Sequence, residues 1–435
     1  MILTIVGLIF LGEVIHCTNV DYANIPAIKL FQEYLQINTT TYNDFGKAVD
    51  FWEKLAKSED LTINKYEYKK GMPVLVIKWP GADPTLNSIV LNSHMDVVPA
   101  DEEDGWTYPP FSGHLSEDGF IYGRGTQDMK SISIQYFEAM KRLKANGMLL
   151  RDVYMTLMPD EEVGGEDGML SFLHSKEFEA MNVGLALDEG GPTPLPLIGV
   201  LIQDKSVWQI QVDCYGVTGH GSTLPAASTT ATGKCNKVIN KLFEYREEQY
   251  KIAAAAPVND AGIYTSVNLN MITGGTAFNV IPNHVSLVFD VRLNTRAVEE
   301  DFEKMLESMI YQDSDGIEVT YILKNAQTPS TIANDSNPYW NAITKAASGM
   351  NLLLLPGIPS GATDSRHLRA AGIPAFGVSP MPNTPLLLHD VDERISVDIF
   401  LGGIDFYEKV IFELANIPGT STANPTHYLY DTRIH

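Results

Sequence analysis

The stretch SIVLNSHMD, residues 88–96, begins as a short apolar run and ends with a histidine and an aspartate two positions apart. Apolar runs of this length that stop at a turn are candidate buried strands, and ligands and catalytic groups in open α/β sheets gather at the carboxyl ends of such strands. Four later stretches carry acidic or imidazole side chains in a similar position: GTQD at 125–128, DEE at 160–162, LDE at 187–189 and LHD at 388–390. We therefore expect these polar side chains to meet at one edge of a sheet.

The residue types in these stretches indicate a metal site. Two histidines and several carboxylates are the nitrogen and oxygen ligands that zinc takes in proteins. So many acidic groups in one place would also repel each other unless cations lay among them. The sequence thus predicts a metal centre that is assembled from distant segments of the chain.

Length and composition limit the classes of protein that fit. The chain has 435 residues, more than a single hydrophobic core usually supports, so two domains are expected. The apolar fraction of 44% and the charged fraction of 20% are typical of a soluble globular protein. The formal net charge of −23 makes nucleic acids and anionic membrane surfaces poor partners.

The order of the predicted elements favours an α/β catalytic domain. Short apolar strands alternate with amphipathic helices in the first half of the chain, which predicts βαβ units and a largely parallel, doubly wound sheet. The same pattern returns near the carboxyl end. The clearest expected elements are strands at 88–91, 153–158 and 374–378 and helices at 131–144, 339–347 and 396–415.

A different pattern interrupts this domain. The stretches 208–214, 267–271 and 287–292 alternate apolar and polar residues with period two, which is typical of half-buried antiparallel strands. Helices are expected within the same region, near 231–249 and 298–311. We therefore predict a smaller inserted α+β domain at 203–323, so that the catalytic domain is discontinuous, with its two parts at 18–202 and 324–435.

The first residues favour export from the cytoplasm. Residues 2–11 form an apolar run that is too short to span a bilayer and is soon followed by Glu13, so residues 1–17 are interpreted as a signal peptide. The alternative is a buried N-terminal helix in a cytoplasmic protein. No other run is long enough for a membrane span, and Asn38 and Asn334 lie in glycosylation acceptor patterns.

Three cysteines occur in the chain. If Cys17 is removed with the signal peptide, Cys214 and Cys235 remain. Two cysteines are no disulfide framework, and spacing alone does not show how far apart they lie in space. One disulfide bond and two free buried thiols are both consistent with the sequence.

The residues within the polar stretches suggest separate roles. His94 and Asp96 are two apart, so on a strand they point to the same side, where Asp96 could hold the imidazole of His94 in one tautomer. Asp128 follows a glycine-rich turn that suits a carboxylate bridging two cations. Glu161 and Glu162 are adjacent and cannot point the same way from a strand, so one could bind metal while the other faces the substrate water.

Five motifs in this order resemble the aminoacylase-1 family of N-acyl-L-amino-acid amidohydrolases, part of a larger zinc metallopeptidase family that includes carnosinases and bacterial carboxypeptidases. The motifs are SHxDVVP, GRGxxDMK, PDEEVGG, LDEG and PxLLHD, and the match extends from about residue 21 to 415. The resemblance implies two zinc ions per subunit. It implies that Asp128 bridges them, that Glu161 is the general base, and that the remaining ligands are His94, Glu189, Glu162 and His389. Asp188 is an alternative to its neighbour Glu189, and the motif favours Glu189.

The resemblance also implies that the inserted domain is a lid that forms a homodimer. His220 would then be lent to the active site of the partner as an oxyanion donor, whereas otherwise it would only stabilise a glycine-rich turn. Arg369 would grip the α-carboxylate of the substrate, and Thr363 would line that pocket. Asn279 and Arg292 would be polar contacts from the inserted domain. The histidines at 114, 174, 284 and 367 lie in no motif and are expected to be ordinary surface or turn residues.

The expected function is hydrolysis of the amide bond of N-acyl-L-amino acids by a secreted, zinc-dependent enzyme. A dipeptidase or carboxypeptidase of the same fold is an alternative, since a peptide is also an N-acyl amino acid. A binding protein without activity is a second alternative, but it would be expected to lack Glu161 or one of the ligands, and all of them are present.

Overall fold

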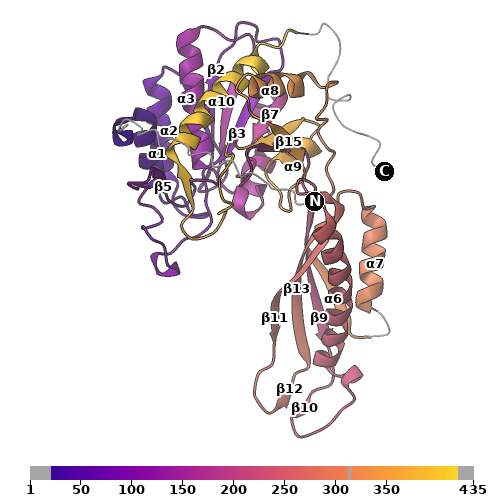
Figure 1. Cartoon of the computed structure of the whole chain (residues 1–435). Helices are drawn as coiled ribbons and strands as arrows, with labels where there is room; N and C mark the ends of the chain where they lie inside the picture. The colour runs from indigo at the N-terminus through magenta and orange to yellow at the C-terminus, as the bar shows by residue number, and fades with distance from the viewer. Residues whose placement is uncertain (1–20, 312–314, 420–435) are drawn as a thin grey trace, which may run out of the picture.

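The computed structural model describes residues 21–311 and 315–419. Figure 1 shows two parts: an α/β layer structure that contains both ends of the described chain, and an elongated second part that projects from it. The expected signal peptide, residues 1–17, lies outside the described residues. Within those residues no helix has the length and apolar character needed to cross a membrane.

The larger part is built on a mixed eight-stranded sheet. Its central strands run parallel, since β3 pairs with both β6 and β7, and β7 pairs with β16 in the same direction. Antiparallel pairs occur toward both edges, where β2 joins β6 and β16 joins β8, so the expectation of a largely parallel sheet holds only for the centre. In spatial order the strands are β1 (Thr62–Lys69), β2 (Met72–Trp79), β6 (Val153–Met158), β3 (Ser88–His94), β7 (Val183–Asp188), β16 (Ala375–Val378), β8 (Ile198–Leu201) and β15 (Leu354–Gly357).

Helices cover both faces of this sheet, which explains why its central strands are buried along almost their whole length. Along β3, Ile89 and Leu91 pack into the core of one face, while Val90 packs into the core of the other. The first face is covered by α1 (Pro26–Leu35), α2 (Gly46–Ser58), α3 (Lys130–Asn146), α8 (Pro338–Ser348) and α10 (Val397–Ala415). The second face is covered by α4 (Ser171–Leu173), α5 (Lys176–Glu179) and α9 (Ser365–Ala370). A small sheet of β4 (His114–Leu115), β5 (Phe120–Tyr122) and β17 (Arg394–Ser396) lies beside them.

The inserted part has its own hydrophobic core. Side chains along β13 alternate between buried and half-buried, as the period-two pattern predicts, and the buried ones pack against two helices. Its antiparallel sheet has the order β11 (Ser266–Gly274), β13 (His284–Leu293), β9 (Ser206–Tyr215) and β14 (Ile317–Lys324), and its helices are α6 (Ala231–Ala255) and α7 (Glu299–Tyr311). Far from the large sheet, β10 (Gly219–His220) pairs with β12 (Val280–Ile281) (Figure 1).

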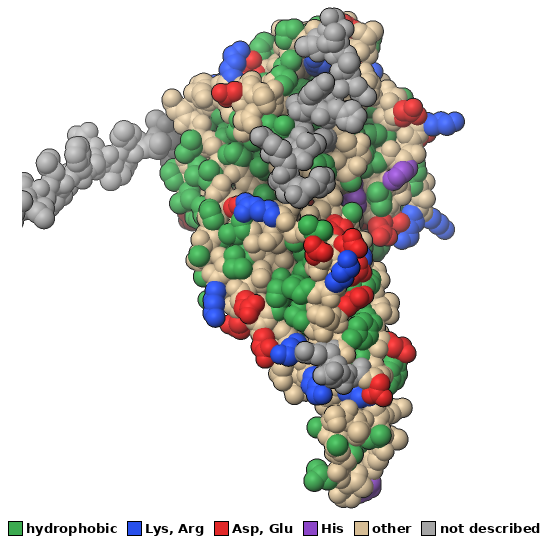
Figure 2. Space-filling model, turned by 90° about the vertical axis from the view of Figure 1, so that its right-hand side faces the viewer, with side chains coloured by type: hydrophobic (Ala, Val, Ile, Leu, Met, Phe, Trp, Pro, Cys, Tyr) green, Lys and Arg blue, Asp and Glu red, His purple; other side chains and the backbone are tan. Residues whose placement is uncertain are grey.

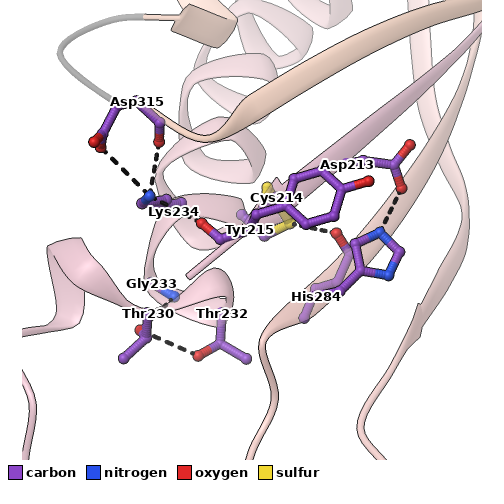
Figure 3. Close-up of a disulfide and its surroundings, with 11 residues drawn as sticks. Asp213, Cys214, Tyr215, Thr230, Thr232, Gly233, Lys234, His284 and Asp315 are labelled. Atoms are coloured by element: carbon purple, nitrogen blue, oxygen red, sulfur yellow. Dashed lines mark hydrogen bonds and ion pairs between the residues drawn. A yellow bond between two sulfur atoms is a disulfide. The ribbon is translucent and has the colours of Figure 1, made fainter. Parts of the chain in front are cut away.

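Cys214 and Cys235 form a disulfide bond in this part (Figure 3). Cys214 lies at the end of β9 and Cys235 in the first turns of α6, with their Cα atoms 5.8 Å apart. The bond therefore closes the loop of chain that includes β10. The sequence left the pairing of these cysteines open, because residues 21 positions apart can lie near or far in space.

Candidate active site

The five proposed metal ligands lie together at the carboxyl edge of the large sheet. His94 is the last residue of β3, while Glu162 and Glu189 follow the neighbouring strands β6 and β7. Because these three strands are parallel, their carboxyl ends meet at one edge, as in other open α/β sheets. Asp128 and His389 reach the same place from two loops, and the backbone φ of His389 is +63°, an uncommon conformation for a residue with a side chain.

Asp128 lies between the two histidines. Its Oδ1 is 3.1 Å from Nε2 of His94, and its Oδ2 is 3.1 Å from Nε2 of His389. Glu189 Oε2 is 3.5 Å from His94 Nε2, and Glu162 Oε2 is 3.0 Å from His389 Nε2. Each histidine therefore has its own glutamate, and the aspartate offers one oxygen to each side.

Asp188, the alternative to Glu189, points elsewhere. Its carboxylate accepts hydrogen bonds from Asn92 Nδ2 at 2.9 Å and from Ser365 Oγ at 2.7 Å. These bonds occupy Asp188 in the packing between β3 and α9. The geometry thus agrees with the choice of Glu189 as the residue that faces His94.

Asp96 contacts both His94 and the turn after β6, whereas the sequence predicted only the contact with His94. The nearest partner of His94 Nδ1 is the backbone carbonyl of Asp96 at 2.8 Å, and the Asp96 carboxylate is farther away at 3.4 Å. A carbonyl only accepts, so Nδ1 carries the proton and Nε2 is left to bind a cation. The Asp96 carboxylate instead accepts from the backbone N–H groups of Glu161 at 3.1 Å and Glu162 at 3.2 Å, which holds the turn after β6.

The buried carboxylate of Glu393, which the sequence did not reveal, holds the backbone at Asp128 in place. Glu393 accepts hydrogen bonds from the backbone N–H groups of Gln127 at 2.6 Å and Asp128 at 3.2 Å. It also pairs with Arg124 at 2.7 Å, the arginine of the glycine-rich turn. The residue lies in a polar run without any recognisable motif, so only the tertiary structure reveals its role.

Glu161 is buried beside this cluster, near an arginine. Its Oε1 lies 3.7 Å from Nη1 of Arg366, which also donates a hydrogen bond to the carbonyl of Thr363 at 3.0 Å. The Nε of Arg366 is buried without a hydrogen-bond partner among the described residues. A glutamate and a partly unsatisfied guanidinium thus lie next to the proposed ligands.

The electrostatics of the cluster favour cations. Burial is the largest influence on the pKa of Glu161 and of Glu189 and raises both well above the ordinary value, while burial raises the pKa of Glu162 to about 7. Hydrogen bonds to Asp128 and Glu162 raise the pKa of His389 to about 10. Crowded acids of this kind are stabilised either by protons or by bound divalent cations.

The donor set also fits metal ions. Ligand atoms of His94, Asp128 and Glu162 lie within 4.8 Å of one another, as do those of His94, Glu161 and Glu189. Glu162 Oε1 is buried without a hydrogen-bond partner among the described residues, which leaves an oxygen available for coordination. Imidazole and carboxylate donors in this arrangement suit zinc.

The prediction that Arg369 binds substrate is wrong, because its side chain is 0% exposed and its donors are occupied. It forms an ion pair with Asp204 and donates to the carbonyls of Leu201 at 3.0 Å and Ala375 at 2.8 Å. Asp204 lies in the segment that leads into the inserted part, so Arg369 holds that segment against the catalytic layer. The arginine that faces the proposed ligands is Arg366, three residues earlier on the same short helix.

Thr363 is also buried and acts through its backbone. Its N–H donates to Asp204 Oδ1 at 3.1 Å, and its carbonyl accepts from Arg366. Thr363 therefore positions Arg366 and presents little surface to a substrate. His367, expected to be an ordinary surface or turn residue, is buried as well, and its Nε2 donates to the carbonyl of Gly164 at 2.9 Å.

The remaining predicted site residues lie in the inserted part. His220 and Asn279 are exposed near β10 and β12, at the end that is farthest from the large sheet in Figure 1. Arg292 lies on β13 and pairs with Asp290 through contacts of 2.8 and 3.2 Å. A single chain thus does not bring His220 or Asn279 to the metal-ligand cluster.

Comparison with known proteins agrees with this architecture. The sequence matches the peptidase family M20/M25/M40 over residues 90–413. The chain belongs to peptidase family M20/M25/M40. Among solved structures, an M20 family metallo-carboxypeptidase from Sulfolobus solfataricus superimposes with a TM-score of 0.72 at 17% identity, covering 90% of this chain and 99% of that one. Human carnosine dipeptidase 1 gives a TM-score of 0.64 at 14% identity, covering 90% and 97%. These likenesses confirm the expected fold class.

Closer relatives are found by sequence. Aminoacylase-1A of Rattus norvegicus and aminoacylase-1 of Homo sapiens are each 42% identical to this chain over 395 residues, which cover 90% of it and 96% of each relative. Aminoacylase-1 of Dictyostelium discoideum is 33% identical over 405 residues, covering 90% and 98%. The expected resemblance to the aminoacylase-1 family is therefore confirmed.

Proposed function

We propose that this protein is a metal-dependent amidohydrolase that cleaves N-acyl-L-amino acids into a carboxylate and a free L-amino acid. The observation that carries the proposal is the convergence of His94, Asp128, Glu162, Glu189 and His389 around a buried Glu161 in a chain that is 42% identical to aminoacylase-1 proteins. Family membership supports metal dependence. The substrate class follows from the relatives with the highest identity.

The proposed cofactor is a pair of zinc ions. His94 and Glu189 would hold one ion and His389 and Glu162 the other, because each histidine has its own glutamate within 3.5 Å. Asp128 would bridge them through its two oxygens. Two such ions supply Lewis acidity, which lowers the pKa of the attacking water and polarises the acyl carbonyl.

Glu161 would move the proton. It would take a proton from the water whose oxygen attacks the acyl carbon, and pass it to the amide nitrogen as the carbon–nitrogen bond breaks. The water oxygen stays on the acyl carbon of the product. One water proton reaches the amine through Glu161, and the second leaves the new carboxyl group as it ionises and is taken up by the amine or by solvent. Burial of Glu161 supports this role, because it raises the pKa of the carboxyl well above its ordinary value and so makes the carboxylate a stronger base.

Arg366 would bind the α-carboxylate of the amino acid. Its guanidinium lies near Glu161 and has a buried Nε without a hydrogen-bond partner among the described residues, so it retains a donor for a planar anion. The carbonyl of Thr363 orients it. This assignment moves the carboxylate-binding role from Arg369 to Arg366.

A homodimer would complete the site. His220 and Asn279 are exposed at the far end of the inserted part, so they would reach a metal centre only in a second copy of the chain. There His220 could donate a hydrogen bond to the oxyanion that forms on the acyl carbon. Arg292 remains a predicted polar contact from the inserted part.

We also propose that the protein is secreted. The disulfide supports an oxidising compartment, and the acceptor residues Asn38 and Asn334 are both exposed. Expression with the native N-terminus in a secretory host tests this proposal. Protein with shortened N-terminus and attached glycans is expected in the medium, and retention of full-length, unglycosylated protein in the cell would contradict it.

The function is tested by one assay of the purified protein. Hydrolysis of N-acyl-L-amino acids is compared with hydrolysis of dipeptides, before and after chelation and again after zinc is added. Hydrolysis of acyl amino acids that chelation abolishes and zinc restores is the expected result. A preference for dipeptides would point to a peptidase, and binding of acyl amino acids without turnover would point to an inactive binding protein.

A further inference from the structure

The far end of the inserted part is a small ribbon that carries both His220 and Asn279. Gly219 pairs with Ile281 and His220 with Val280, and Gly221 N–H donates to the carbonyl of Asn279 at 2.6 Å. We call residues 216–230 and 274–283, which form this end, the tip. The backbone pairing means that anything brought close to His220 is also close to the other side chains of the tip.

The tip is uncharged in a strongly acidic protein. Residues 216–230 and 274–283 contain no Asp, Glu, Lys or Arg, although the whole chain has a formal net charge of −23. In Figure 2 the lower end of the inserted part shows green and tan surface without red or blue. A surface without carboxylates can approach a cluster of acidic ligands without charge repulsion, and it loses no charge hydration when it is buried.

Two large apolar side chains of the tip are fully exposed to solvent. The relative exposure of Leu224 is 99% and that of Phe278 is 114%. They belong to the two segments that contain His220 and Asn279, and Val217 and Val280 add further exposed apolar surface. Apolar side chains grouped in this way indicate a surface that is covered by an apolar partner.

The rim of the metal-ligand cluster has matching exposed apolar residues. Val163 follows Glu162 directly, while Leu386 and Val391 lie three positions before and two positions after His389. All three side chains are exposed in the single chain. An apolar group held between this rim and the tip of another copy would therefore lose water from both sides.

We propose that the tip of one subunit forms the acyl-binding wall of the active site of its partner, and that Leu224 and Phe278 contact an apolar acyl chain there. The inference rests on the proposed function and narrows it to N-acyl amino acids with hydrocarbon acyl groups. The occupant is the acyl chain because His220 would lie at the reacting carbonyl, which is where that chain begins. If the tip instead only packed against protein, it would affect dimer stability and leave acyl preference unchanged.

Mixed dimers with one working site test the proposal. One subunit, the receiver, carries His220→Ala and keeps its own Glu161. The other subunit, the donor, carries Glu161→Gln and keeps His220. Different affinity tags allow recovery of the mixed dimer alone, in which all turnover combines the cluster of the receiver with the tip of the donor.

Leu224→Ala and Phe278→Ala are then introduced together into the donor or, as the matched control, into the receiver. The measured quantity is the ratio of kcat/KM for N-octanoyl-L-methionine to that for N-acetyl-L-methionine. In the donor, these substitutions are expected to lower the ratio about tenfold or more, because the longer chain loses apolar contacts that the acetyl group never makes. In the receiver they are expected to leave it unchanged.

Val258→Ala in the donor is a second control, because Val258 is another exposed apolar residue of the inserted part. It is expected to leave the ratio unchanged. An active mixed dimer whose ratio is unaffected by the donor substitutions, or falls equally with those in the receiver, would overturn the acyl-wall inference alone. A mixed dimer no more active than the His220→Ala and Glu161→Gln parents would overturn the lending of His220, and the inference with it.

Discussion

The carboxyl edge of the large sheet and the tip of the inserted part carry predicted site residues in opposite surroundings. At the sheet edge, Glu161 and Glu189 are buried among other ionisable groups, and His94 and Asp128 hold each other in place. At the tip, His220 is exposed among uncharged side chains. One chain assembles the first cluster by itself, because parallel strands end together at one edge of the sheet, whereas in the proposed homodimer the tip would act only beside another copy.

The largest effect is expected at the sheet edge, from loss of the proton carrier. Glu161→Gln is expected to lower kcat about 10²- to 10⁴-fold, because the amide cannot accept a proton from water. Metal content, measured by mass spectrometry, should match the unaltered protein. Glu166→Gln, at an exposed glutamate nearby, is the control and should keep its activity. Rapid turnover by the Glu161→Gln variant would show that Glu161 does not transfer the proton, and that the sheet edge is not the catalytic region in the way proposed.

The next prediction distinguishes a structural role for Arg369 from a substrate-binding role for Arg366, two arginines of the same helix. Arg369→Met is expected to lower the free energy of unfolding by about 3–5 kcal/mol, because it leaves Asp204 buried and unpaired. Urea titration measures this loss, and adding Asp204→Asn should recover part of it. Arg366→Met should instead lower kcat/KM with a much smaller loss of stability. The reverse pattern would return the carboxylate-binding role to Arg369.

The disulfide offers a test of the inserted part. Replacing Cys214 and Cys235 by serine opens a loop of 21 residues, which is expected to lower the free energy of unfolding of this part by about 3 kcal/mol. Thermal unfolding with and without the bond measures the loss. Metal content should not change, since the ligands lie in the other part. Loss of metal together with the bond would show that the two regions are coupled.

The smallest expected effect depends on pH and concerns the layer behind the sheet edge. Burial, and then the nearby Arg366, lower the pKa of His367 from 6.5 to about 4. Below pH 6.5 the unfolded chain binds a proton at His367 that the folded chain does not bind, and this difference favours unfolding. The free energy of unfolding is therefore unaffected by His367 above pH 6.5 and decreases as the pH falls toward 4. At pH 5 the loss is about 2 kcal/mol.

The measurement is the pH dependence of the free energy of unfolding between pH 7.5 and 5 for the unaltered protein and for His367→Gln. The glutamine variant should lose less stability over this range, since its side chain does not titrate. If the free energy of unfolding changed equally with pH in the two proteins, the pKa of His367 would not be lowered by folding.

Much of the fold could be predicted because its periodic patterns are local. The strand at 153–158 was predicted with the bounds that the structure gives, and the helix at 131–144 differs by one or two residues at its ends. The antiparallel edges of the large sheet were missed, since strand direction depends on how connections run in space. Glu393 and Asp204 carried no motif, and their roles come from contacts with residues far away in the sequence.

The residues available to bind metal, and the strands that precede them, could be read from the order of amino acids, because a buried strand and the polar residue at its end are neighbours in the chain. The contacts of the two arginines depend on the folded molecule. Arg366 and Arg369 lie on one face of the same short helix, about 4.5 Å apart along its axis, and segments distant in the sequence bring Glu161 to the first and Asp204 to the second. Only the tertiary structure decided that His220 lies far from the metal ligands of its own chain, since that distance depends on the path of the inserted part.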